Sequence, residues 1–90
     1  MMEKTFKITA PEGLHARPAA LLVSAATPFL ADITLHFKEK GANLKSIMGV
    51  MAQGVPSGGT VVISAQGSDE AEALQAIGDV IATKGIGEEC

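Results

Sequence analysis

The stretch GLHARP, residues 13–18, lies where an extended segment is expected to give way to a helix. Gly13 has no Cβ, so it can adopt a positive φ at little cost and turn the backbone. Pro18 fixes φ near its helical value and lacks an N–H, which suits the first turn of a helix. We therefore expect His15 at the helix N-terminus. The free amides of the next two residues and the positive end of the helix dipole would then lie near its ring.

These residue types together are suited to hold a transferable anion. A helix N-terminus binds anions through its unpaired amides, and Arg17 adds a planar, permanently charged group that matches phosphate oxygens. A neutral imidazole nitrogen of His15 can attack phosphorus, and the resulting phosphohistidine is labile enough to pass its group onward. Local chemistry leaves two interpretations open: a phosphoryl acceptor, or a tolerated cap residue beside a solvated arginine.

Length and composition indicate one domain, residues 1–90, with a single modest core. Apolar residues make up 47% of the chain but include three Phe and no Trp or Tyr, so the core must be aliphatic and rich in alanine. No apolar run reaches the ~18–20 residues that span a bilayer, and no apolar region follows residues 1–5 as in a signal peptide. The lone Cys90, interpreted as a thiol on a frayed tail, fits a reducing compartment. We therefore expect a cytoplasmic protein without membrane insertion.

The net charge of −3 is unevenly distributed. Residues 1–67 hold six cations and four anions, whereas residues 68–90 hold one cation, Lys84, and six anions. The part with His15 is mildly basic, which suits an anion or an acidic partner but is too weak for nucleic acid. The strands also lack the aromatic pairs on which bases stack. His15, His36 and Cys90 show no metal-ligand spacing, so no metal site and no cofactor are expected.

Hydrophobic periodicity predicts seven elements in the order βαββαβα. The expected strands are 3–9, 32–37, 41–44 and 60–65. The expected helices are 16–27, a short one between the N-cap Ser46 and Gly54, and one from 68 to 84. We expect an α+β fold, an open-faced two-layer sandwich whose four-stranded antiparallel sheet is covered on one face by three helices. Side chains predicted to face the core are Phe6, Ile8, Leu21, Leu22, Ala25, Ala26, Ile33, Leu35, Phe37, Leu74, Ile77 and Ile81.

Two segments of the chain, residues 11–20 and 43–51, together resemble one family. Residues 11–20 (PEGLHARPAA) are similar to the active-site signature of HPr, the histidine-containing phosphocarrier of the bacterial phosphotransferase system. Residues 43–51 (NLKSIMGVM) are similar to its second signature, in the form typical of low-GC Gram-positive bacteria. The resemblance covers nearly the whole chain.

The resemblance implies a role for each matching residue. His15 would receive a phosphoryl group on Nδ1 from phosphorylated enzyme I and hand it to the IIA domain of a sugar permease. Arg17 would steady the phosphoryl oxygens. Ser46 would be the regulatory site of HPr kinase/phosphorylase, and the seryl-phosphorylated form a corepressor for a catabolite-control transcription factor.

The resemblance also implies a docking surface on a monomer that relays phosphate without catalytic turnover. Its residues would be Ala16, Ala20, Ser24, Ile47, Met48, Gly49 and Met51. Family members often carry lysines near the end of the first helix, where this chain has Ser24, Thr27 and Pro28. Electrostatic steering toward an acidic enzyme I should therefore be weaker here.

Two other functions are alternatives to the relay. An enzyme using His15 as acid–base or nucleophile would need an orienting carboxylate and a substrate cleft, and the sequence indicates neither. An HPr-like regulatory paralogue, which acts by binding proteins rather than in sugar transport, would use the same fold and surfaces. The presence of His15 argues against a version switched by serine alone.

Overall fold

The computed structural model describes all 90 residues and contains five strands and three helices. In chain order the elements are β1 (Met2–Ile8), α1 (Ala16–Ala26), β2 (Asp32–Phe37), β3 (Lys40–Asn43), α2 (Ile47–Ala52), β4 (Thr60–Gln66), α3 (Glu70–Thr83) and β5 (Gly87–Glu89). The first seven follow the predicted order, and the α+β class is confirmed. The longest helix, α3, has 14 residues, and no helix combines the length and apolar character needed to cross a membrane.

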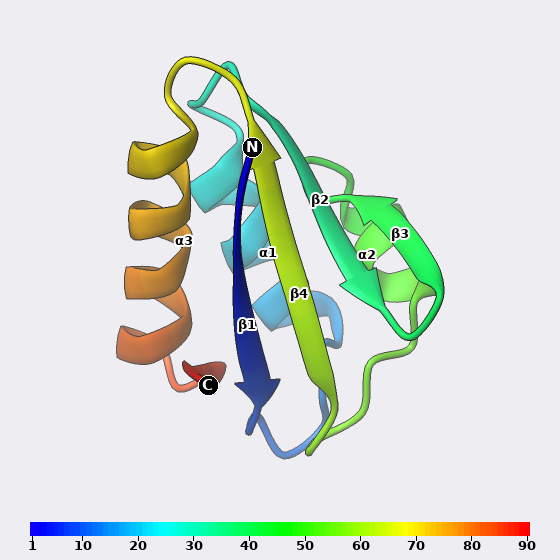
Figure 1. The fold of residues 1–90 in the computed structure, drawn as a ribbon. Helices are drawn as coiled ribbons and strands as arrows, with labels where there is room; N and C mark the ends of the chain where they lie inside the picture. Colours follow the sequence, from blue (N-terminus) through cyan, green and yellow to red (C-terminus); the bar gives the residue numbers. More distant parts are fainter.

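The strands form one antiparallel sheet in the order β3-β2-β4-β1-β5. β4 lies in the middle of the sheet, between β2 and β1, which suits its run of β-branched side chains at Val61, Val62 and Ile63. Figure 1 shows α1 and α2 behind the sheet and α3 alongside β1, and no helix lies in front of the sheet. The predicted two-layer arrangement is therefore confirmed.

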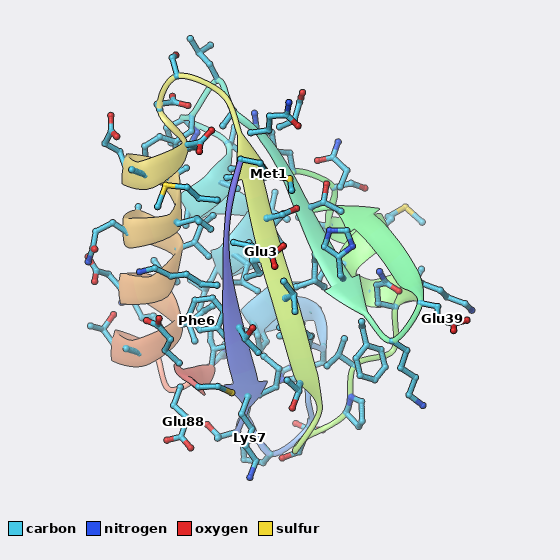
Figure 2. The ribbon with its side chains drawn as sticks, viewed as in Figure 1. Met1, Glu3, Phe6, Lys7, Glu39 and Glu88 are labelled. Atoms are coloured by element: carbon cyan, nitrogen blue, oxygen red, sulfur yellow. The ribbon has the colours of Figure 1, made fainter.

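The core lies between the sheet and the helices and is almost entirely aliphatic. Alternate strand residues point toward the helices, as the pleat requires, and meet buried side chains such as Leu22 of α1 and Ile77 of α3. Phe6 of β1 packs against α3, where a Cβ on Gly78 would lie 3.7 Å from its ring (Figure 2). Burying each such large side chain contributes about 1.5–3 kcal/mol to stability.

Three side chains predicted to face the core are only partly buried: Leu21, Ala25 and Phe37. On α1 the fully buried stripe runs through Ala19 and Leu22 to the end of the helix. Leu21 and Ala25 therefore lie at the border of that stripe and pack against the core from its margin.

The sheet has a fifth strand where four strands and a frayed tail were expected. β5 pairs antiparallel with residues 6–8 of β1, and the amide of Cys90 donates a hydrogen bond to the Thr5 carbonyl at 2.9 Å. The thiol of Cys90 itself is exposed. A three-residue Gly-Glu-Glu segment carries no alternation of apolar side chains. It becomes a strand because the outer edge of β1 offers free backbone groups to pair with.

One carboxylate ties the start of α3 to the connection between α1 and β2. Asp69 accepts hydrogen bonds from the amides of Leu30 at 2.8 Å and Ala31 at 2.9 Å. The Leu30 bond, supported by the Ala31 bond and the charge of Lys45, lowers the pKa of Asp69 below its ordinary value of 3.8, against the opposing effect of partial burial. Because both amides favour the charged form, this tie depends on ionisation.

We predict that Asp69→Asn lowers the thermal stability at neutral pH and makes stability less sensitive to acid. The folded-state pKa of Asp69 is depressed, so its contribution is present above the unfolded-state pKa and is lost as pH falls through the folded-state value. The difference in melting temperature between parent and variant should therefore be largest near pH 7 and shrink below pH ~4. Thermal denaturation across this range measures the difference, with Asp32→Asn, at the exposed first residue of β2, as control. A constant difference at all pH values would contradict the role of the charge.

Candidate functional site

His15 is the N-cap residue of α1, as predicted. Its backbone is extended, with φ −78° and ψ −168°, and its side chain makes no capping hydrogen bond. Its carbonyl starts the helix by accepting the amide of Ala19 at 3.0 Å. The imidazole is exposed and has no hydrogen-bond partner in the chain, so it is free to meet another molecule.

The first turn of α1 presents further groups that are free to bind an anion. The amides of Ala16 and Arg17 lie where a helix has no intrahelical acceptor, and no other backbone carbonyl receives them. The guanidinium of Arg17 is exposed and forms no ion pair. Two amides, one guanidinium and one imidazole thus stand together at the positive end of the helix dipole.

His15 and Arg17 line the same open depression, which has a volume of about 450 Å³. The loop before α1 forms one side of it, and the end of α3 forms the other. The remaining lining residues are Ala10, Pro11, Glu12, Pro18, Leu21, Lys84, Gly85 and Ile86. Glu12 precedes His15 by three residues in the same loop, whereas no local signal in the sequence places Lys84 in this depression, although it stands out as the one cation of residues 68–90.

The loop that carries His15 is pressed against the segment that follows α2. Gly13 has the predicted positive φ, +69°, and a Cβ there would lie 2.2 Å from the carbonyl oxygen of Val55. The same carbonyl accepts the amide of Leu14 at 3.0 Å. The start of α1 and the end of α2 are therefore held side by side.

Ser46 is the N-cap of α2, as predicted. Its backbone is extended, and its Oγ accepts the amide of Gly49 at 3.1 Å. A Cβ on Gly49 would lie 3.3 Å from that Oγ, so the glycine leaves room for the serine side chain. The two N-caps differ. The side chain of Ser46 accepts a hydrogen bond from an amide in the first turn of its helix, whereas the side chain of His15 accepts none.

Exposed apolar side chains gather on α2 and are called the α2 patch here. They are Ile47, Met48 and Met51, which are 42%, 81% and 44% exposed. Large apolar side chains grouped on one short helix are typical of a protein-binding surface, and methionine adapts readily to different partners. The α2 patch continues toward the helix that carries His15, because α1 packs against α2.

The remaining residues predicted for docking lie along one side of α1 and at the base of the α2 patch. Ala16 and Ser24 are exposed, and Ala20 and Gly49 are partly buried. Spacing of four residues puts the three α1 residues on one stripe of small side chains. A partner could therefore approach the α1 backbone closely.

The second histidine lies elsewhere. His36, on β2, is exposed on the open face of the sheet, and its Nε2 is 3.1 Å from Ser64 Oγ. It does not line the depression that holds His15. No three His, Cys, Asp or Glu side chains are arranged to hold a metal ion.

Comparison with known proteins gives one matching family model and several similar solved structures. A family model described as "PTS HPr component phosphorylation site" matches residues 2–83. The crystal structure of HPr-C-His from Thermoanaerobacter tengcongensis is 48% identical, with a TM-score of 0.89, over 93% of this chain and 94% of that one. The histidine-containing phosphocarrier protein of a Mycoplasma is 43% identical, with a TM-score of 0.89, over 94% and 98% of the two chains.

A regulatory protein is also similar. Crh, the catabolite repression protein of Bacillus subtilis, is 38% identical, with a TM-score of 0.71, over 96% of this chain and 98% of that one. Its structure is described as an intertwined dimer with a swapped domain. Phosphocarriers and a regulatory relative thus share this fold.

We predict that Gly13→Ala destabilises the protein by about 3 kcal/mol or more, because backbone strain adds to a clash in a packed loop. Gly54→Ala is the matched control. It also has a positive φ, +62°, but no atom lies within 4 Å of its Cβ position. Left-handed strain alone should cost about 1–2 kcal/mol there. Urea denaturation gives both values, and equal losses would show that the contact between the loop and Val55 is unimportant.

Proposed function

The chain belongs to the HPr family of phosphotransferase-system phosphocarriers, and from this premise we propose that it accepts a phosphoryl group on His15 from phosphorylated enzyme I and passes it to the IIA domain of a sugar permease. One observation carries the proposal: the unpaired ring of His15 shares a depression with the unpaired guanidinium of Arg17. The family match supplies the class of group transferred.

The transfer step needs only what the first turn of α1 offers. The lone pair of neutral Nδ1 on His15 attacks phosphorus while the bond from phosphorus to its donor atom on enzyme I breaks, and that electron pair leaves with the donor. The free amides and Arg17 would receive the charged phosphoryl oxygens. In the second transfer an acceptor atom on the IIA domain attacks phosphorus and forms the new bond while the P–N bond breaks, and the electron pair of the P–N bond returns to the ring. Positioning and charge suffice, so no cofactor is required.

A relay fits this site better than a turnover enzyme does. No carboxylate is hydrogen-bonded to His15, so the ring lacks the group that would orient it as a general base. The depression is open, so a partner's phosphorylated side chain can reach His15. We therefore assign a stoichiometric role, with the α2 patch and the α1 stripe (Ala16, Ala20 and Ser24) contacting each partner in turn.

Ser46 is proposed as the regulatory phosphorylation site, used by HPr kinase/phosphorylase. A phosphate there would add about −1.5 to −2 charges beside the α2 patch. An acidic partner would be repelled, and an apolar contact would have to bury a charge. The same charged form would present a new surface to a catabolite-control transcription factor.

An HPr-like regulatory paralogue is the second candidate, favoured by the similarity to Crh. The two candidates differ at His15, since a relay is phosphorylated there and a purely regulatory protein is not. We propose that the relay acts as a cytoplasmic monomer, because the start of α1 and the α2 patch must both reach the partner. Light scattering on the purified protein tests the monomer against the swapped dimer described for Crh.

We predict that His15→Ala abolishes phosphorylation by enzyme I and phosphoenolpyruvate, whereas His36→Ala leaves it intact. His36 is the matched control because it is an exposed histidine outside the depression. The measurement is incorporation of an acid-labile, alkali-stable phosphate. Labelling that survives in His15→Ala would refute the relay, and labelling absent from the parent protein would favour the regulatory candidate.

We predict that Ser46→Asp slows phosphoryl transfer from enzyme I while stability stays the same or rises slightly. An aspartate keeps the N-cap acceptor and suits the positive end of a helix, but it places a charge beside the α2 patch. Ser68→Asp adds the same charge at an exposed position before α3 and should transfer at the parental rate. Rapid-quench transfer assays and melting curves measure both. Parental transfer rates in Ser46→Asp would place Ser46 outside the docking surface.

A further inference from the structure

We propose that Lys84 is a second phosphoryl-binding cation, which holds the group on His15 from the side opposite Arg17. This inference rests on the proposed function and adds a residue to the same site. Its starting observation is that Lys84, from the end of α3, lines the depression that also contains His15 and Arg17.

The fold holds the end of α3 beside the loop that carries His15. α3 ends just before Lys84, and Gly85 turns the chain with φ +68°. Ile86, 1% exposed, then anchors the turn in the core. Its carbonyl accepts the amides of Thr9 at 2.9 Å and Ala10 at 3.1 Å, where β1 leads into the loop. Figure 1 shows this end of α3 and the loop after β1 at the same end of the sheet.

The charges around the depression show what Lys84 contributes. The charged residues that line the depression are Glu12, Arg17 and Lys84, and none of them forms an ion pair within the chain. With Lys84 the depression carries one net positive charge, and without it none. The last carbonyls of α3 add partial negative charge at this place, which Lys84 offsets. A phosphoryl group carrying about two negative charges, which the free amides and Arg17 already attract, therefore meets a more favourable field when Lys84 is present.

The ammonium of Lys84 forms no ion pair in the unphosphorylated protein. Its side chain is exposed, and its flexible stem lets the ammonium move to a phosphoryl oxygen. An interaction made in the phosphorylated state and absent from the free state shifts the phosphorylation equilibrium toward the carrier. A charge that only steered partners would change the rate of transfer and leave this equilibrium unchanged.

The test measures the equilibrium between phosphoenolpyruvate and the phosphorylated carrier. Full-length protein is incubated with enzyme I and phosphoenolpyruvate, with pyruvate in excess so that transfer is reversible, and intact mass spectrometry gives the phosphorylated fraction. Lys84→Gln should lower the equilibrium constant about two- to fivefold, the range of an exposed ion pair. Lys84→Glu should lower it further, and Lys84→Arg should restore the parental value. Lys40→Gln removes the same charge from edge strand β3 and should have no effect.

The possible outcomes distinguish a failure of the proposed relay from a failure of the role proposed for Lys84. A parent protein that is not phosphorylated on His15 would refute the proposed relay. If the parent is phosphorylated and Lys84→Gln matches Lys40→Gln, the relay stands and the role of Lys84 is refuted. Melting temperatures of the four variants show whether a change in equilibrium reflects folding, and restoration by Lys84→Arg supports a direct charge contact.

Discussion

Burial of one face of the antiparallel sheet against α1, α2 and α3 determines where the functional groups lie. The strands turn alternate apolar side chains to the same side, and the helices must cover that side with their own apolar stripes. The chain has three Phe and no Trp or Tyr, and Phe6 alone among these is buried, so the core is filled almost entirely by aliphatic side chains. The helices α1 and α3 use buried side chains along their length for this packing, and α2 uses Val50. The ends of the helices and the outer side of α2 are left to meet other molecules.

The two N-caps show how differently helix ends can be used. Ser46 accepts the amide of Gly49 and completes α2 within the chain. His15 makes no such bond, so α1 forgoes the ~1 kcal/mol that a capping side chain typically contributes. The amides that remain free are the groups that we propose receive the phosphoryl oxygens. In this proposal, the missing cap lowers the stability of α1 but leaves its first amides free to bind the phosphoryl group. The buried side chains in the middle of α1 compensate for that loss of stability.

Contacts between segments distant in sequence organise the two ends of the molecule. At one end, Asp69 joins α3 to the connection between α1 and β2. At the other end, Ile86 joins the turn after α3 to the end of β1, and Val55 joins the segment after α2 to the loop before α1. The ties made by Ile86 and Val55 position the end of α3 and the loop before α1, and both of these segments line the depression. Although residues 68–90 are acidic, the depression is mildly basic, because Lys84 is the only charged residue of that segment that lines it.

The sequence by itself determined the features that depend on neighbouring residues: the alternation of the strands, the buried stripe of α3, the N-caps His15 and Ser46, and the positive φ of Gly13. Signals of this kind act over a few residues, so they can be interpreted without knowing the rest of the fold. Only the tertiary structure decided that residues 87–89 form a strand, because the free edge of β1 comes from the opposite end of the chain. The same holds for Lys84, whose place beside His15 depends on Ile86 reaching the loop after β1. Such positions follow from long-range packing and backbone pairing, which no local pattern encodes.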